Sequence, residues 1–352
     1  MSGRATLLRG ARRAAGASAD HATTLGYLSG WRLVRLLPER RAQAVFRRVA
    51  DEVYRRRGAG VLRLRANLAR VRPGLDDYGL EELTHAAVRS YLRYWCESFR
   101  LPAWPVDDVV RRTRTVDEHH VRDAHAGGRG VVVALPHMAN WDWAGTWACA
   151  TGMPLSTVAE RLRPERLYDE FVAYRTTLGM QILPLTGGEG ALPKLEEWVR
   201  RGGLVCLLAD RDLSRTGVDV TLCGARARIP RGPALLARRT GAPLVPVTLH
   251  YSGDDMTITF HAPVPHADGQ QGLLAMTQGV ADAFSRALRE HPQDWHMMQR
   301  VFVDESFVGD PEMVFNAGTH TDCIRMHYGD FEDLAQPTVG RFSRPRHIAK
   351  ES

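Results

Sequence analysis

The middle of the chain alternates short apolar runs with amphipathic stretches, and this order constrains the fold more than any other feature. The apolar runs, rich in β-branched residues, are Val131–Leu135, Leu155–Ala159, Gln181–Leu185, Leu204–Ala209 and Leu244–His250. The helical patterns between them are Asp142–Cys149, Pro164–Leu178, Ala191–Arg200 and Gly232–Thr240. Strands that alternate with helices are typical of a mainly parallel sheet flanked by helices.

Two expected hairpins make the predicted sheet mixed. Val218–Leu222 and Ala225–Ile229 flank Gly224, and His250–Thr257 contains a Ser-Gly-Asp-Asp turn. Upstream, apolar residues recur at helical spacing from Tyr27 to Val71 and from Leu80 to Phe99. We therefore predict an α/β fold: a central, mostly parallel but mixed sheet flanked by helices, preceded by an N-terminal amphipathic helical region.

Length and periodicity indicate one large domain with two less regular ends. A chain of 352 residues with 44% apolar content can bury a full α/β core. Residues 1–21, rich in Arg, Ala and Gly, predict a flexible basic leader. Residues 22–305 predict a single domain, with helices in 22–100 and the α/β core in 101–305. Residues 306–352 show neither period and predict a poorly ordered tail.

The N-terminal quarter of the chain is strongly basic. Residues 1–72 hold seventeen arginines and only four acidic residues. Two interpretations remain open: the arginine-rich amphipathic helices lie on an anionic bilayer through Tyr27 and Trp31, or their apolar faces pack on the core and the arginines are merely solvated. The chain contains no run of eighteen apolar residues, so we expect no membrane-spanning helix.

Several classes of protein are disfavoured by what the sequence lacks. The five cysteines are scattered without a Cys-x-x-Cys pair, which favours neither a disulfide framework nor a zinc site. His320, Cys323 and His327 in the tail also lack the spacing of metal ligands. There is no Gly-x-Ser-x-Gly elbow and no P-loop, and no recognisable nucleic-acid-binding motif. We expect no nucleic-acid partner.

His137 follows the first apolar run of the core, and Asp142 follows it five residues later. Ligands of open α/β sheets bind beyond the carboxyl ends of strands, so His137 is placed to face a substrate. Residues five apart on one ideal helix point about 140° away from each other, so His137 is expected in a turn and Asp142 in the first helical turn. Asp142 then either orients His137 as a general base or merely helps to start the helix.

Two further strand ends carry charged residues. Asp210-Arg211-Asp212-Leu213-Ser214-Arg215 follows Leu204–Ala209, and Glu160-Arg161 follows Leu155–Ala159. A carboxylate of the first cluster can orient His137, and Arg211 or Arg215 can bind a phosphate, although a surface salt-bridge turn explains the same cluster. A metal phosphoesterase with His137, Asp142, Asp210 and Asp212 as ligands also remains open at this point.

Pro136-His137-Met138-Ala139-Asn140-Trp141-Asp142 resembles the His-x4-Asp block of the glycerolipid acyltransferase superfamily, in the branch that includes the lipid A and phosphatidylinositol mannoside acyltransferases. Four other blocks resemble the mannoside enzymes: residues 27–35 (YLSGWRLVR), 159–164 with 171–175 (AERLRP and FVAYR), 210–215 (DRDLSR) and 291–296 (HPQDWH). The resemblance covers about residues 22–305, and the combination is much more specific than the first block alone.

The resemblance implies an acyl-CoA-dependent transferase with no bound cofactor and no acyl-enzyme. His137 is then the general base, and the acceptor is a mannosyl hydroxyl of a phosphatidylinositol mannoside at the cytoplasmic face of the membrane. The acidic partner aligns with Asp210, where family members carry Glu, so Asp142 is expected to be the steadier orienting group. The substrate-binding candidates are Glu160, Arg175, Arg211, Arg215 and Thr216.

Other interpretations remain beside this one. The donor can be an acyl carrier protein in place of CoA, and the acceptor a lysophospholipid or a lipid A-type precursor. A non-catalytic module whose basic helices grip anionic lipid is a different class of protein, and the metal phosphoesterase is a third.

Overall fold

The structure is a computed structural model, and it describes residues 30–160, 165–185, 190–212 and 217–299, with the backbone of four short strands beyond them. The predicted leader at residues 1–21 and most of the predicted tail at 306–352 lie outside the described residues. The short strands are β10 (Val303–Asp304), β11 (Met313–Asn316), β12 (Cys323–Met326) and β13 (Val339–Gly340). β10 pairs with β13, and β11 pairs with β12.

The centre of the fold is a seven-stranded mixed sheet in the order β1-β9-β8-β2-β5-β3-β4. Its strands are β1 (Thr113–Val116), β2 (Val131–Leu135), β3 (Leu155–Ala159), β4 (Gln181–Pro184), β5 (Leu204–Leu208), β8 (Leu244–Ser252) and β9 (Asp255–Phe260). Only the β8–β9 hairpin is antiparallel within it. The prediction of a mostly parallel, mixed sheet is confirmed.

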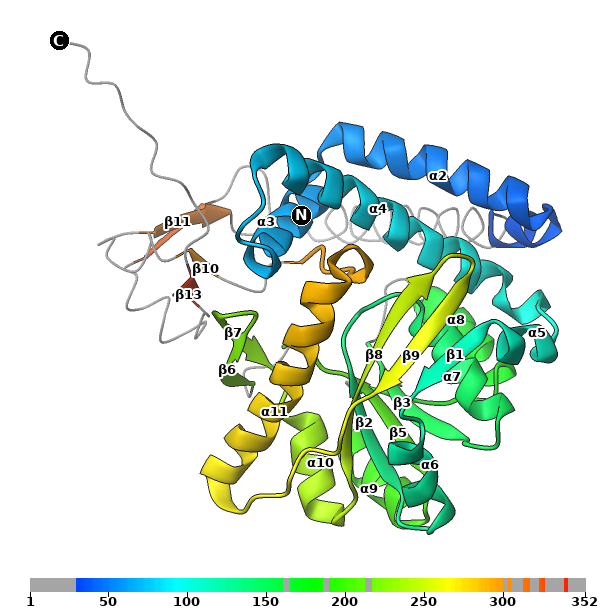
Figure 1. Cartoon of the computed structure of the whole chain (residues 1–352), viewed down its shortest axis with the longest axis vertical. Coiled ribbons are helices and arrows are strands. Elements are labelled where there is room, and N and C mark those ends of the chain that lie inside the picture. Colours follow the sequence, from blue (N-terminus) through cyan, green and yellow to red (C-terminus); the bar gives the residue numbers. More distant parts are fainter. Residues whose placement is uncertain are drawn as a thin grey trace, which may run out of the picture.

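Helices cover both faces of the sheet (Figure 1). α6 (His119–Ala126), α7 (Trp141–Ala150) and α8 (Glu165–Thr177) lie on one side, and α9 (Ala191–Arg200), α10 (Gly232–Thr240) and α11 (Gly269–Glu290) on the other. Because both faces are covered, every residue of β2 is buried, which accounts for its uninterrupted apolar sequence. This arrangement brings the carboxyl ends of β2, β5 and β3 to one edge.

The N-terminal region folds as a helical layer across the carboxyl-end edge of the sheet (Figure 1). Residues 30–36 are helical, followed by α2 (Glu39–Arg56), α3 (Ala59–Val71) and α4 (Asp77–Arg100). Asp76 caps α4 by accepting a hydrogen bond from the backbone N–H of Gly79 (2.7 Å). The helical pattern predicted from Tyr27 to Val71 thus forms separate helices, because Pro38 and Gly58 interrupt it.

The apolar side chains of these helices are partly buried in the fold and partly exposed. Leu64 and Leu68 of α3 are buried with Leu80 and Val88, and Trp31 is buried against Phe99, Phe171 and Tyr174. The exposed Leu and Val side chains on this layer are those of Leu33, Leu36, Val45, Val49 and Leu62. In the described part of the chain no helix is both long and apolar enough to cross a membrane.

Both hairpins form where they were predicted, but β1, two helices before β2 and the short strands β10 to β13 were not predicted. β6 (Val218–Leu222) and β7 (Ala225–Ile229) pair as a separate two-stranded sheet, and β8 and β9 turn at residues 253–254. The two unpredicted helices are α5 (Val106–Arg111) and α6. β1 reads Thr-Arg-Thr-Val and alternates between half-buried and exposed, so it lacks the apolar run that marks the central strands.

Candidate functional site

The segment Pro136–Asn140, which we term the His137 turn, joins the end of β2 to the start of α7. Ala139 adopts a left-handed backbone conformation (φ 43°), which turns the chain sharply toward the helix. Asn140 then caps α7, because its side-chain oxygen accepts a hydrogen bond from the backbone N–H of Trp143 (3.0 Å). His137 therefore precedes the helix, as the sequence predicted.

The sheet register brings His137 and Asp210 together. β2 lies beside β5 with Leu135 opposite Leu208, and His137 and Asp210 each follow two residues later. The imidazole Nδ1 of His137 is 2.6 Å from Oδ1 of Asp210, and the backbone N–H of His137 donates to Oδ2 (2.9 Å). The predicted contact between the two strand-end clusters is thus formed by Asp210.

The surroundings of Asp210 favour its charged form. Its side chain is fully buried, and burial by itself raises the pKa of a carboxyl group. The charge of His137 and hydrogen bonds from His137 and Trp295 outweigh burial and lower the pKa of Asp210 below its ordinary value. A charged Asp210 holds the proton of the neutral imidazole on Nδ1, which leaves Nε2 free to accept a proton.

The ring of His137 is accessible from one side. About a fifth of its side chain is exposed (20%), in contrast to the fully buried Asp210. Within the residues that the structure describes, Nε2 has no hydrogen-bond partner. The indole of Trp141 lies against the ring edge-on, with 5.4 Å between centroids. The site can therefore deprotonate a hydroxyl that approaches from the open side.

Asp142 has a different role from the expected one. Its carboxylate accepts hydrogen bonds from Nε of Arg175 (2.7 Å) and from the hydroxyl of Tyr94 (3.1 Å), and no hydrogen bond joins it to His137. The reason lies in the Ala139 turn, which places the first turn of α7 beside α4 and α8. The orienting contact predicted for Asp142 is therefore corrected in favour of Asp210, and Asp142 anchors Arg175.

Arg175 itself was expected to bind a substrate phosphate. Its side chain is mostly buried (18% exposed), and its ion pair with Asp142 keeps it charged. Burial alone lowers the pKa of a guanidinium, but the neighbouring carboxylate of Asp142 raises the pKa of Arg175 above its ordinary value. The structure thus joins two predicted site residues to each other, and the phosphate contact of Arg175 stays a prediction.

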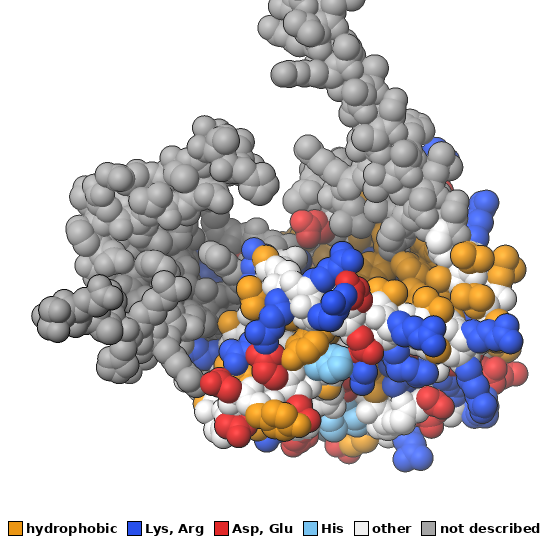
Figure 2. All heavy atoms as spheres, turned by 90° about the horizontal axis from the view of Figure 1, so that it is seen from above, with side chains coloured by type: hydrophobic (Ala, Val, Ile, Leu, Met, Phe, Trp, Pro, Cys, Tyr) orange, Lys and Arg blue, Asp and Glu red, His pale blue; other side chains and the backbone are white. Residues whose placement is uncertain are grey.

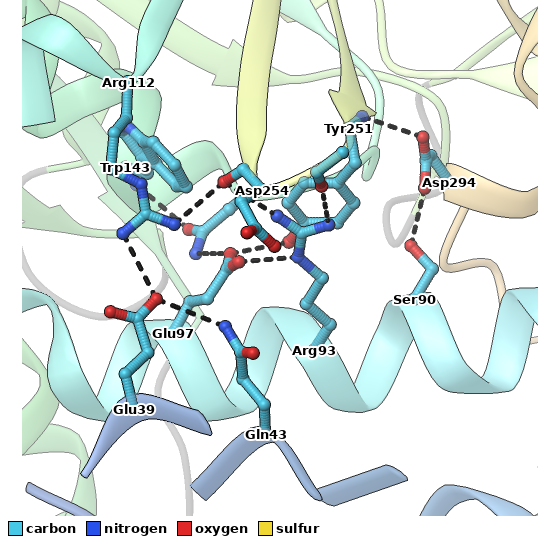
Figure 3. Close-up of polar contacts among 12 residues, drawn as sticks. Glu39, Gln43, Ser90, Arg93, Glu97, Arg112, Trp143, Tyr251, Asp254 and Asp294 are labelled. Atoms are coloured by element: carbon cyan, nitrogen blue, oxygen red, sulfur yellow. Dashed lines mark hydrogen bonds and ion pairs between the residues drawn. The ribbon is translucent and has the colours of Figure 1, made fainter. Parts of the chain in front are cut away.

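A second buried carboxylate holds the His137 turn from the side of α4. Glu97 is only 2% exposed and accepts hydrogen bonds from Asn140 (3.2 Å) and from the hydroxyl of Tyr251 (2.9 Å). Arg93 bonds the other oxygen of Glu97 (2.6 Å) and covers the ring of Tyr251 (Figure 3). The helical layer is therefore tied to the helix cap that ends the His137 turn.

The remaining predicted site residues fall into two groups. Arg211 and Glu160 lie 3.6 Å apart at the ends of β5 and β3, as neighbouring strand ends allow. Glu160 is more than half exposed, so this pair contributes little stability by itself. Arg215 and Thr216 lie outside the described residues.

The four ligands considered for a metal phosphoesterase do not converge on one point. Asp142 is occupied by Arg175 and Tyr94, and Asp210 by His137 and Trp295. Asp212 accepts from the backbone N–H of Gly217 (3.0 Å). In the described ranges, no group of three or more acidic, His or Cys side chains is arranged to hold a metal ion.

An apolar cavity lies under the His137 turn, between one face of the sheet and α6 and α7. Alternate residues of the strands line it, because side chains on one face recur every second residue. These are Val133, Leu135, Leu155, Thr157, Leu204, Cys206, Leu208, Val247, Leu249, Ile258 and Phe260. Asp142 and Arg175 also line this cavity, as do Gly145 and Met180. The sequence did not predict the cavity, because it depends on the size of side chains brought together by the sheet order.

Sequence reasoning also missed Trp295 as a site residue. Its indole N–H donates to Oδ2 of Asp210 (2.8 Å), across 85 residues of chain. The only signal was the block His291-Pro292-Gln293-Asp294-Trp295-His296, noted for its resemblance and given no role. Tyr94 and Glu97 on α4 were missed as well, because helical periodicity alone does not separate them from core or surface positions.

Comparison with known proteins gives a consistent result. The sequence pattern of the family described as bacterial lipid A biosynthesis acyltransferase matches residues 18–303. A protein of Mycolicibacterium smegmatis named phosphatidylinositol mannoside acyltransferase is 45% identical over 281 residues, which cover 79% of this chain and 90% of that protein. A Mycobacterium tuberculosis H37Rv protein of the same name is 41% identical over 281 residues, with 79% and 88% covered.

Proposed function

Because the chain belongs to the bacterial lipid A biosynthesis acyltransferase family and is therefore an acyltransferase, we propose that it transfers a long acyl chain from CoA to a mannose hydroxyl of a phosphatidylinositol mannoside. The relatives named for that glycolipid support the choice of acceptor. The contact between His137 and the buried Asp210 is the observation that carries the chemistry.

In the proposed reaction, Nε2 of His137 takes the proton of the acceptor hydroxyl as its oxygen attacks the thioester carbonyl. Asp210 stabilises the positive charge that develops on the imidazole, because its carboxylate lies 2.6 Å from Nδ1. The tetrahedral intermediate then expels the CoA thiolate, which recovers the proton from His137. The ester forms directly on the sugar oxygen, and no acyl-enzyme is needed.

We propose that the apolar cavity under the His137 turn receives the acyl chain. Leu135 and Leu208, two residues before His137 and Asp210, line it, so its upper end lies next to the proposed base. Its walls are mostly hydrocarbon, and Asp142 and Arg175 are the charged residues among them. The cavity measures about 90 Å³, so it takes the first few methylene groups of the chain, and each one removed from water contributes about 0.8 kcal/mol.

The function is tested by mass analysis of products. The purified protein is incubated with palmitoyl-CoA and, separately, with a phosphatidylinositol mannoside, a lysophospholipid and a lipid A precursor. We expect one added palmitoyl mass on the mannoside and release of free CoA in equal amount. Acylation of only another acceptor would contradict the proposed substrate, and a parallel reaction with palmitoyl-acyl carrier protein compares the two donors.

A variant of Gly145 tests the site of the acyl chain in the same assay. A β-carbon at Gly145 would lie 2.6 Å from the terminal methyl of Met180, a flexible group that can move further into the cavity. Gly145→Ala is thus expected to shorten the preferred acyl-CoA while leaving the helix intact, since alanine favours helix more than glycine does. An unchanged ranking of C10 to C18 donors would show that the chain binds elsewhere.

We further propose that the helical layer rests on the anionic cytoplasmic face of the membrane. Leu33, Leu36, Val45 and Val49 are 60%, 81%, 46% and 44% exposed. Figure 2, which faces this layer, shows hydrophobic side chains interspersed with Lys and Arg. Apolar side chains among arginines are typical of helices that lie in the headgroup region of an anionic bilayer.

Vesicle sedimentation tests the membrane proposal. With phosphatidylinositol-rich vesicles, Leu36→Glu is expected to weaken binding about tenfold or more, because burial of one leucine contributes roughly 1.5–3 kcal/mol. Leu274→Glu is the matched control, since Leu274 is exposed near the start of α11, and that end of α11 lies at the opposite end of the molecule from α2 (Figure 1). Equal losses in the two variants, or none in either, would count against the proposed face.

A further inference from the structure

We propose that Trp295 is a positioning residue that holds Asp210 and the His137 turn in the geometry needed for proton transfer. The inference rests on the proposed function, because it assumes that His137 is the base. Trp295 lies far along the chain from the two strands that His137 and Asp210 follow, and it is almost fully buried (1% exposed).

The first support is the set of donors around Asp210. Its carboxylate receives three hydrogen bonds, two from His137 itself and one from the indole N–H of Trp295 (2.8 Å). Within the described residues, Trp295 is therefore the one hydrogen-bond donor to Asp210 other than His137, the residue that Asp210 orients. Because Asp210 is fully buried, water cannot take the place of a lost donor, and the loss of any one hydrogen bond leaves its carboxylate partly unsatisfied.

The second support is a pairing of backbones. Met138 and Trp295 form an antiparallel bridge, in which His296 N–H donates to the carbonyl of His137 (2.8 Å) and Ala139 N–H donates to the carbonyl of Asp294 (2.9 Å). Ala139 has the strained positive φ, which persists only where the surroundings fix it. The segment that carries Trp295 thus holds the residues on both sides of Met138.

The third support is that this segment is itself anchored. The carboxylate of Asp294 accepts from the hydroxyl of Ser90 on α4 (2.7 Å) and from the backbone N–H of Tyr251 on β8 (3.0 Å), as Figure 3 shows. The hydroxyl of Ser90 also lies 3.0 Å from Nε2 of His296. Trp295 is therefore flanked by two residues held from the helical layer, and its indole has little freedom to leave Asp210.

Among the described residues, His137 and His296 are titratable groups whose charges interact with that of Asp210. Burial, assisted by the charge of His137 and opposed by that of Asp210, lowers the pKa of His296 to about 3. His296 is therefore neutral at the pH of the reaction, and protonation of the His137–Asp210 pair sets the acid limb of the pH–rate profile. Removal of the indole donor raises the pKa of Asp210, so the pair binds a proton more readily.

Trp295→Phe tests the proposal, since phenylalanine keeps an aromatic ring and lacks the N–H. We expect kcat to fall about 10- to 100-fold with KM for acyl-CoA nearly unchanged, as for loss of one hydrogen bond to a charged group. The acid limb is expected to move to higher pH by about half a unit or more. Trp104→Phe is the matched control, because the buried indole N–H of Trp104 has no hydrogen-bond partner within the described residues.

A proton NMR measurement makes the result independent of any acceptor. The Nδ1 proton of His137, bonded to Asp210, is expected downfield in the wild-type protein, absent in His137→Ala, shifted in Trp295→Phe and unchanged in Trp104→Phe. A wild-type kcat or an unmoved acid limb in a folded Trp295→Phe protein would overturn the positioning role. If the wild-type protein acylates no mannoside but the NMR shift appears, only the proposed function fails.

Discussion

Replacing His137 by alanine is expected to lower acyl transfer by about 10²- to 10⁴-fold, the range that a positioned general base contributes. The hydroxyl of a sugar is a weak nucleophile at neutral pH. Without His137, no described side chain that is hydrogen-bonded to Asp210 can accept the proton of that hydroxyl. The measurement is release of CoA and formation of acylated glycolipid by the purified variant.

The His137→Ala protein is expected to stay folded. The ring is partly exposed, and Asp210 keeps the hydrogen bonds from Trp295 and from the backbone N–H of residue 137. His119→Ala, at an exposed position on α6, serves as the control and is expected to retain full activity. Near-normal turnover of acyl-CoA by a folded His137→Ala variant would refute the mechanism.

Asp142→Ala is expected to destabilise the fold by about 3–5 kcal/mol, the cost of leaving one member of a buried ion pair without its partner. Arg175 is mostly buried, and its Nε donates to Asp142 at 2.7 Å. Tyr94, whose hydroxyl also bonds Asp142, loses a partner in the same variant. Urea unfolding followed by circular dichroism measures the change in the free energy of unfolding.

The double variant Asp142→Ala, Arg175→Met separates a structural role from a chemical one. Replacing both members of a buried pair by apolar groups is often neutral, so most of the lost stability is expected to return. If Asp142→Ala unfolded at the same urea concentration as the wild-type protein, the proposed stabilising role of the Asp142–Arg175 ion pair would be wrong. A large loss of activity in a stable double variant would instead assign Asp142 or Arg175 to substrate binding.

The strands of the core were predictable because their sequences are almost purely apolar. β2 and β5 begin at the predicted residues, since a strand covered on both faces needs apolar side chains at nearly every position, and β3 begins as predicted although it contains Ser156 and Thr157. β1 was missed for the converse reason: its polar sequence is stabilised by pairing with β9, far along the chain. The local sequence pattern indicates which side chains are buried. It indicates strand pairing only where the pairing also buries the side chains of the strand.

The part of the site that could be predicted is the part that depends on the carboxyl ends of parallel strands lying at one edge of the sheet. That rule brought His137 and Asp210 together without knowledge of the sheet order, because both follow parallel strands. It did not assign the partner of Asp142, since the positive φ of Ala139 decides where α7 starts and points. Trp295 depends on a contact across 85 residues, for which no local pattern exists.

The backbone pairing of Met138 with Trp295 also determines the stage of synthesis at which the site around His137 can first be completed. Every strand of the central sheet has left the ribosome once Phe260 has emerged, and domains generally fold as units during synthesis. The His137 turn, however, acquires its backbone partners only when Asp294, Trp295 and His296 follow. A nascent chain that already holds both His137 and Asp210 therefore still lacks the segment that fixes them.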